Sequence, residues 1–335
     1  MKRGWLLWKE NRLHVVDDGT EIAIEGPGEI GAAVVDDLAF TVARYGLLAF
    51  PRGQSVSCWR SEAGDVSKFL ELPPMPDRGE MTDLGLHPRY GIITMLRGGI
   101  ALVGDHARWS SNEVPEGTRW VAFDDAGALW AAGSRPSERV PGARTEIAAW
   151  RRDPGGAWRD VPISLSFFDA LKAIRGGGFE SLSGIDPSIE PVVLAAECAW
   201  PLDDPSWFLY VRHAGKFTVQ KLRGRRLARL DRDTADVPWA FTTDGELWTF
   251  DGRRFRAAGL AAPLAHALRL RTNETRSVQL AVARPFIRGV VTIWREGHRH
   301  GHLTIASDDD GRNWELGERI EWPSPHRFIA GFLIE

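Results

Sequence analysis

Hydrophobic and polar positions alternate along most of the chain, in short runs separated by Gly, Asp, Asn and Pro. The pattern is clearest near the C-terminus, where residues 290–294 form a strand-like run and residues 303–306 and 314–316 alternate apolar and polar side chains. Alternation with a period of two, broken by turn residues, is typical of β-strands with one buried face. The pattern therefore predicts an all-β chain of short antiparallel strands.

The segment SDDDGRNW, residues 307–314, lies between two of these predicted strands. Three aspartates in so short a stretch would suit a metal site, a pair of catalytic carboxylates or a tight turn. Aspartate accepts hydrogen bonds from backbone N–H groups two or three residues further on, and glycine adopts positive φ readily. A tryptophan beside the turn would bury its ring. The position between two strands favours the structural turn.

A degraded second copy of this segment occurs earlier in the chain, in AAWRRDPGGAWRDV. Aspartate, glycine and tryptophan have the same spacing in both copies, as Asp309, Gly311 and Trp314 and as Asp153, Gly155 and Trp158. Arg151 stands where the first copy has Ser307. A different hairpin pattern relates residues 120–133 to residues 239–252, with residues 13–26 as a weaker copy. Recurrence of such units predicts a repeat architecture.

Ser307, Asp309, Gly311 and Trp314 match S-x-D-x-G-x-x-W, the Asp-box of sialidase-type and BNR-repeat β-propellers, with Asn313 in place of the usual Thr. The resemblance implies a structural hairpin on the outer rim of a propeller, away from any active site. The second hairpin pattern resembles the inner strand pairs of propeller blades of the WD40/YVTN-like kind. Such a resemblance bears on fold and says little about function.

Division of the chain at these signals gives about seven units. We therefore expect a single β-propeller over residues 1–335, with seven four-stranded blades and a ring closed by N- and C-terminal strands that share a blade. Six or eight blades also agree with the pattern, because residues 84–118 and 222–236 show weak strand signals. Inserts near residues 166–182 and 259–274 have helical character, and they would carry function or act as packing caps.

Composition and charge set the expected setting of the protein. The net charge of −3 indicates no overall preference for nucleic acid or membranes. Cys58 and Cys198 lie in different predicted blades, so no disulfide framework is indicated. The apolar run at the N-terminus is too short for a signal peptide, and no stretch is long enough to span a membrane. We expect a cytoplasmic protein.

Catalytic signatures are not apparent in the sequence. A sialidase would need an arginine cluster for the substrate carboxylate, a tyrosine nucleophile with a glutamate partner, and an aspartate that acts as the acid catalyst. The F/Y-R-I-P signature of that family has no match, and Tyr45, Tyr90 and Tyr210 have no obvious glutamate partner. Nucleophile-elbow, zinc-protease, P-loop and dinucleotide motifs do not occur either. No catalytic residue and no cofactor is predicted. A sialidase-like glycoside hydrolase, or another enzyme with its site in the central pocket, stays as the alternative.

His298, His300 and His302 are weak candidates for metal ligands. On a strand these alternate residues would share one face, and imidazoles suit Zn²⁺, Ni²⁺ or Cu²⁺. Gly297 and Gly301 indicate a turn instead, which would separate the three rings. A solvated polar loop is the favoured interpretation.

The predicted loops of one face are rich in arginine and poor in acidic residues. Those expected to bind a partner are Arg52, Arg135, Arg139, Arg144, Arg212, Arg253, Arg254 and Arg299. Arginine is favoured at interface hot spots and in pairs with carboxylates. We therefore predict a non-catalytic propeller that binds another, acidic protein on the face opposite Asp153 and Asp309, as an immunity protein or an assembly factor would. Arginines scattered over the surface are the alternative.

Overall fold

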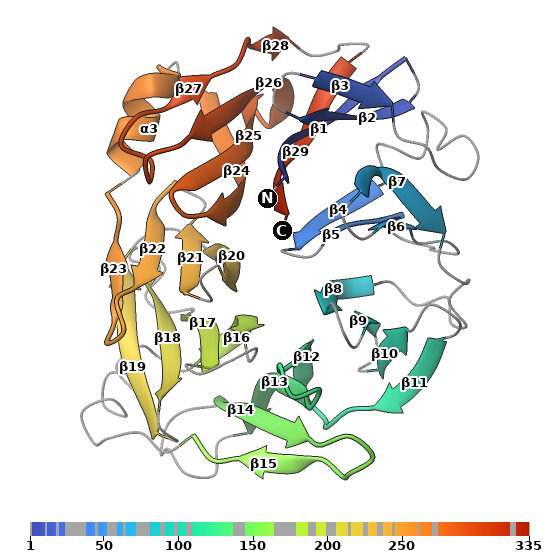
Figure 1. Ribbon diagram of the computed structural model, residues 1–335. Helices are drawn as coiled ribbons and strands as arrows, with labels where there is room; N and C mark the ends of the chain where they lie inside the picture. The colour runs from blue at the N-terminus through green and yellow to red at the C-terminus, as the bar shows by residue number, and fades with distance from the viewer. Residues whose placement is uncertain are drawn as a thin grey trace.

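The structure is a computed structural model in which only part of the chain is described. The described residues are 2–10, 12–17, 20–23, 38–43, 46–51, 59–62, 65–71, 81–87, 91–96, 100–104, 109–136, 145–163, 179–186, 192–198, 206–213, 216–223, 227–232, 237–242, 245–259, 261–269, 274–321 and 326–334. Within them the strands form seven antiparallel sheets, arranged in a ring (Figure 1).

Six of the sheets run in chain order from the innermost strand to the outermost. The first two are β4 (Leu38–Ala43), β5 (Gly46–Pro51), β6 (Trp59–Glu62) and β7 (Asp65–Glu71), then β8 (Met81–His87), β9 (Gly91–Leu96), β10 (Ile100–Gly104) and β11 (Trp109–Glu113). The next two are β12 (Thr118–Phe123), β13 (Leu129–Pro136), β14 (Thr145–Arg152) and β15 (Arg159–Val161), then β16 (Phe179–Asp186), β17 (Val192–Cys198), β18 (Ser206–His213) and β19 (Lys216–Arg223). The last two are β20 (Leu227–Arg232), β21 (Pro238–Thr242), β22 (Leu247–Phe250) and β23 (Phe255–Ala257), then β24 (Glu274–Ala283), β25 (Phe286–Arg295), β26 (His298–Ser307) and β27 (Glu315–Leu316), with β28 (Ile320–Glu321) also paired to β26.

The seventh sheet joins the two ends of the chain. Its order is β29 (His326–Ile334), β1 (Lys2–Lys9), β2 (Arg12–Asp17) and β3 (Thr20–Ala23). The pairing of β29 with β1 runs from Lys2 opposite Ile334 to Lys9 opposite His326. Both chain ends therefore lie toward the middle of the ring (Figure 1). The expected sharing of one sheet by the terminal strands is observed, and the pairing leaves no free edge on the inner side of β1.

The core lies between neighbouring sheets. One cluster packs Trp239 and Phe241 of β21 against Val278, Ile287 and Val291 of the next sheet. Side chains alternate across a strand, so a sheet between two neighbours buries apolar residues on both faces. Burial at roughly 25 cal/mol per Å² of apolar surface makes these contacts the main stabilising force between the sheets.

Several of the innermost strands contain β-bulges, whereas β4 and β24 pair with their neighbours without one. Register shifts interrupt the pairing of β8 with β9, of β12 with β13, of β16 with β17 and of β20 with β21. A bulge adds one residue to one strand and moves the following side chains to the other face. The alternation in the sequence is therefore broken where β16 and β20 lie, and this is why the sequence pattern did not predict these two strands.

The repeat of residues 120–133 in residues 239–252 does not reflect equivalent positions. The first stretch spans β12 and β13, the two inner strands of their sheet, whereas the second spans β21 and β22, the two middle strands of theirs. The prediction that both are inner strand pairs is therefore wrong for residues 239–252. A strand, an Asp/Gly turn and a Leu-Trp strand make a stable hairpin at either position.

The two predicted inserts differ in how their described residues fold. Residues 261–268 form the helix α3 (Ala261–Leu268), which lies in the second insert. Residues 179–182, which we assigned to the first insert, begin strand β16. The helical segment expected near residues 169–175 lies outside the described residues. Among the described helices, none has the length and apolar character required to cross a membrane.

Candidate interaction surfaces and the aspartate turns

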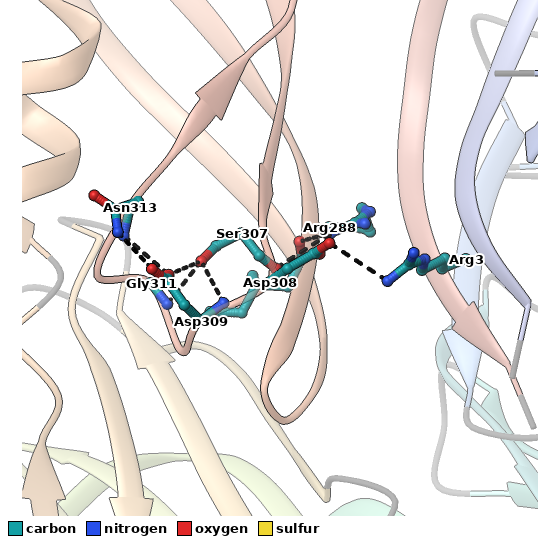
Figure 2. A network of polar contacts seen from close by, with 8 residues as sticks. Arg3, Arg288, Ser307, Asp308, Asp309, Gly311 and Asn313 are labelled. Carbon is teal, nitrogen blue, oxygen red and sulfur yellow. Dashed lines mark hydrogen bonds and ion pairs between the residues drawn. The ribbon is translucent and has the colours of Figure 1, made fainter. Parts of the chain in front are cut away.

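The turn between β26 and β27 is closed by Asp309 and its neighbours (Figure 2). The hydroxyl of Ser307 donates to Oδ1 of Asp309 at 2.8 Å and accepts from the backbone N–H of Gly311 at 2.9 Å. Asn313 donates from its backbone N to Oδ1 at 2.9 Å and from Nδ2 to Oδ2 at 2.6 Å. These bonds, led by the backbone N–H of Asn313, hold the pKa of Asp309 below its ordinary value.

The two flanking aspartates have partners outside the turn. Asp310 accepts two hydrogen bonds from Arg284, at 2.7 and 3.0 Å, which join this turn to the one between β24 and β25. Asp308 accepts from Arg288 at 2.7 Å and from Arg3 of β1 at 3.5 Å. Each aspartate therefore has its own structural contacts. No group of three or more His, Cys, Asp or Glu side chains suited to a metal ion occurs within the described part of the chain.

Arg288 and Trp5 join this sheet to the closing sheet. The side chain of Arg288 is 8% exposed and also donates to the backbone carbonyls of Ile287 and Ser307, at 2.9 and 3.2 Å. Its guanidinium lies 5.7 Å from the centroid of the Trp5 ring, and the Trp5 indole nitrogen donates to the carbonyl of Gly289 at 3.1 Å. The residues before and within the turn therefore stabilise ring closure (Figure 2).

The second aspartate turn has a different set of contacts. Arg151, at the place of Ser307, donates to Asp153 at 2.5 Å and to the buried Asp124 at 3.2 Å, and Arg159 also contacts Asp153. A charged side chain thus replaces the serine hydroxyl as the partner of the turn aspartate. The same arginine connects the turn between β14 and β15 to the turn between β12 and β13.

The tryptophans after the two turns are half-buried. Trp314 packs against the cluster around Val291 and Ile305. Trp158 packs against the cluster that includes Val121 and Trp150, and its indole nitrogen donates to the backbone carbonyl of Glu113 in the neighbouring sheet. Partial burial makes each ring a packing element at the outer part of its sheet.

The three histidines do not converge. They lie on β26 and not in a turn, but a bulge falls between the pairs Trp294–Arg299 and Ile293–Gly301. The extra residue, His300, places His302 on the face opposite His298. His302 is buried and its Nε2 accepts from the backbone N–H of Phe328 at 2.9 Å, so it serves the contact between β26 and β29. His300 lies 3.4 Å from Glu321.

The arginines predicted to bind a partner occupy two ends of the sheets. In an antiparallel sheet the connections of strands one to two and three to four lie at one end, and the connection of strands two to three lies at the other. Arg135 and Arg299 lie beside second-to-third connections. Arg212, Arg253 and Arg254 lie beside third-to-fourth connections, like Asp153 and Asp309. Their expected position at the end opposite these aspartates is therefore wrong. The remaining members of the set, Arg52, Arg139 and Arg144, lie outside the described residues.

Arg135 is engaged within its own sheet. Its Nε donates to Glu146 at 2.8 Å and its Nη1 donates to Asp160 at 3.0 Å. The hydrogen bond to Glu146, followed by that to Asp160, raises the pKa of Arg135. Two carboxylates therefore compensate its charge, and it offers little attraction to an external anion.

The exposed Arg299 forms a corner with the half-buried Trp294. The two residues are paired across the hairpin of β25 and β26, and the guanidinium lies 5.6 Å from the centroid of the indole ring. The Trp294 indole nitrogen donates to Ser277 at 3.2 Å. Glu296 and Gly297 form the turn with φ of 52° and 80°, the two positive values of a type I′ hairpin. The corner is thus held by a short turn of fixed geometry.

Of the three tyrosines considered for catalysis, Tyr210 is 1% exposed and belongs to a core cluster with Phe208 and Val192. It is a packing residue with no access to a substrate. Tyr45 and Tyr90 lie outside the described residues.

Comparison with known proteins bears on the fold. No protein-family model and no curated protein matches the chain. YCF48 from Cyanidioschyzon merolae is 11% identical, with a TM-score of 0.50 over 84% of this chain and 85% of that one. A hypothetical selenium-binding protein from Sulfolobus tokodaii is 10% identical, with a TM-score of 0.53 over 97% and 94%. A quinonprotein alcohol dehydrogenase-like protein from Bacteroides thetaiotaomicron is 7% identical, with a TM-score of 0.52 over 98% and 77%. At these identities the likeness concerns the fold alone, and with the ring of antiparallel sheets it shows that the chain is a β-propeller.

Proposed function

We propose that this propeller has seven blades, works in the cytoplasm and binds a protein partner through the end of the ring where second and third strands connect. The observation that carries the proposal is the corner formed by the exposed Arg299 and the half-buried Trp294 beside a two-residue turn. Tryptophan and arginine are the residues most enriched at interface hot spots. A short, fixed turn loses little conformational freedom when it binds, which favours affinity.

The partner we propose has an acidic surface. Arg299 is exposed at this corner, and its planar guanidinium suits a carboxylate fork. Arg52, Arg139 and Arg144 stay predicted members of the same surface, and Arg135 leaves the set because Glu146 and Asp160 compensate its charge. An immunity protein that sequesters a toxin and an assembly factor are the two roles we consider, and both need only a binding surface.

The supporting test is a comparison of two charge-reversal variants. Tagged protein is used to capture partners from native lysate, and each captured protein is identified by mass spectrometry and then purified. Binding of the purified partner is next measured for the wild type, Arg299→Glu and Arg312→Glu. Arg312 is an exposed arginine of the turn between β26 and β27 at the other end of the same sheet, so it is the matched control.

We expect Arg299→Glu to weaken binding, to slow association and to reduce its dependence on salt, because charges at an interface rim act mainly on the encounter rate. Arg312→Glu should bind as the wild type does. Equal binding by all three proteins would contradict the proposed surface. The Asp-box family, the blade number and the cytoplasmic location stay predictions, and cell fractionation tests the last of these.

A further inference from the structure

Three arginines face the boundary between the sheet of β12–β15 and the sheet of β16–β19 (Figure 1). Arg151 is paired with Arg159 of β15 and with Trp130 of β13, so these three residues share one face of their sheet. Trp130 belongs to the core cluster between the two sheets, which makes this the inner face. Arg212 lies two residues beyond Tyr210 on β18, and Tyr210 belongs to the same cluster. The three arginines therefore lie on the two faces that meet, at the end where third and fourth strands connect.

Contacts across the boundary bring Arg212 to the arginines of the other sheet. Its guanidinium lies 5.9 Å from the centroid of the Trp130 ring. Trp130 is 2% exposed, and its indole nitrogen donates to Oδ2 of Asp124 at 3.0 Å. Nη2 of Arg151 lies 3.1 Å from the same carboxylate oxygen. The buried indole and the carboxylate of Asp124 thus connect Arg212 with Arg151.

Two aspartates accompany these three arginines, and both are already engaged. Oδ1 of Asp124 accepts two backbone N–H groups of its own turn, at 3.0 and 2.8 Å, and its Oδ2 accepts from the indole and from Arg151. Asp153 contacts Arg151 with one carboxylate oxygen and Arg159 with the other. The side chain of Arg212 is half-buried and makes no hydrogen bond or ion pair within the described part of the chain. One positive charge at this boundary is therefore left without a carboxylate.

We propose that Arg212 binds a carboxylate of an acidic, Asp- or Glu-rich segment of a second protein. Burial of a charge costs free energy unless an ion pair and hydrogen bonds compensate it, and an incoming carboxylate supplies both. The contact with the indole ring positions the guanidinium and leaves its planar fork of N–H donors available.

The charge balance favours a carboxylate over a phosphate group. A carboxylate carries one negative charge and so matches the single surplus charge of Arg212. A phosphate monoester carries nearly two, and the second would lie close to the ionised Asp124 and Asp153. The site is independent of the corner at Trp294 and Arg299, because it lies at the other end of the sheets.

Fluorescence anisotropy with a labelled, acetylated peptide of alternating glutamate and glycine tests the site. At low salt the wild-type protein should bind this peptide and not a control peptide with glutamine at every glutamate, and binding should weaken as salt rises. Arg212→Gln removes the charge and keeps a polar side chain, and it should weaken binding about fivefold or more. Arg212→Lys should lie between, because the charge stays and the planar fork is lost.

Lys216→Gln is the matched control. Lys216 lies at the same end of the same sheet as Arg212, but it alternates with the buried Phe217 of the core cluster and so lies on the other face. The variant removes the same single charge and should bind the peptide as the wild type does, within about twofold for the change in net charge. Equal loss in Lys216→Gln and Arg212→Gln would show an effect of net charge alone and would overturn the proposal.

Four further outcomes would also overturn it. They are no binding of the glutamate peptide, unchanged binding by Arg212→Gln, wild-type affinity in Arg212→Lys, and displacement of the peptide by inorganic phosphate far more readily than by acetate at equal ionic strength. Thermal melting checks that each variant is folded, and Arg212→Lys decides if Arg212→Gln is not.

Arg299→Gln separates this site from the proposed partner surface. Loss of peptide binding in Arg299→Gln alone would contradict the present inference and support the surface at Trp294. Loss in Arg212→Gln alone would support the inference and leave that surface to its own test.

Discussion

The indole nitrogen of Trp158 donates a hydrogen bond of 2.8 Å to the backbone carbonyl of Glu113, which belongs to the neighbouring sheet. Arg152, one strand away, donates to Asn112 of the same neighbouring strand at 3.1 Å. The outer parts of these two sheets are thus joined by polar contacts in addition to the apolar core between them. Bonds of this kind limit the sliding of one sheet against the next.

Trp158→Ala should lower the free energy of unfolding by about 2–3 kcal/mol, below the usual loss for a fully buried tryptophan, because the ring is half-buried. Trp158→Phe keeps most of the packing and removes the hydrogen bond, and should cost about 1 kcal/mol. Urea unfolding of the three proteins measures both differences. Partner binding by the folded variants should be unchanged. A loss of binding at unchanged stability would contradict the structural role of the turn.

Asp309 should contribute to stability at neutral pH and lose that contribution in acid. Its folded pKa lies below the ordinary value of 3.8, so the ionised carboxylate is favoured by folding. Stability gained in this way is present above the unfolded pKa and disappears as pH falls through the folded pKa. We therefore expect Asp309→Asn to melt at a lower temperature than the wild type at pH 7. The difference in melting temperature between the two proteins should shrink as the pH falls below about 4. A difference in melting temperature that stays constant with pH would show that the charge of Asp309 has no role in the turn.

His302→Phe should destabilise the contact between β26 and β29. The imidazole Nε2 is the acceptor for the Phe328 backbone N–H, and the substitution leaves that N–H without this partner in a part-buried position. An unsatisfied backbone donor costs about 1–3 kcal/mol. Hydrogen exchange of the Phe328 amide should accelerate, while His298→Phe, at the exposed start of the same strand, should leave it unchanged. Unchanged exchange in His302→Phe would refute this role.

Arg135→Ala should have little effect on partner binding, unlike Arg299→Glu. The ion pairs of Arg135 are partly exposed, with Asp160 61% exposed, so their loss should cost no more than about 1 kcal/mol of stability. Titration of a purified partner against Arg135→Ala would reveal the difference. A loss of affinity as large as that of Arg299→Glu would place Arg135 back in the binding surface.

The sequence predicted the all-β fold from short apolar runs in the middle strands and from alternation in outer strands. The outer strand β19 is an example of alternation, with Phe217 and Val219 buried and Lys216 and Thr218 exposed. The strands β16 and β20 were not predicted from the sequence, because the extra residue of a bulge reverses the alternation within a strand. The shift of residues 239–252 from an inner to a middle strand pair has the same origin, because the unrecognised β20 is the innermost strand of that sheet.

The binding residues were harder to predict than the strands. Arg212, Arg253 and Arg254 can be assigned to one end of a sheet only by counting the strands that precede them in that sheet. One missed strand therefore reverses the assignment. The compensation of Arg135 by Asp160 could not be read from the sequence, because the two residues meet only through the pairing of β13, β14 and β15. The role of Trp294 was missed for a similar reason. Its pairing with Arg299 follows from the two-residue turn at residues 296–297, which the strand pattern alone does not specify.

Site-specific photocrosslinking in the native host tests the central claim most directly. A photoreactive phenylalanine analogue is placed at His298, which is exposed next to Arg299, and in a second protein at Arg312, at the other end of the sheet. The account predicts a covalent adduct with one acidic protein from position 298 and none with that protein from position 312. An adduct with that protein from position 312 alone, or no adduct from position 298, would contradict the proposal that this end of the propeller binds a protein partner.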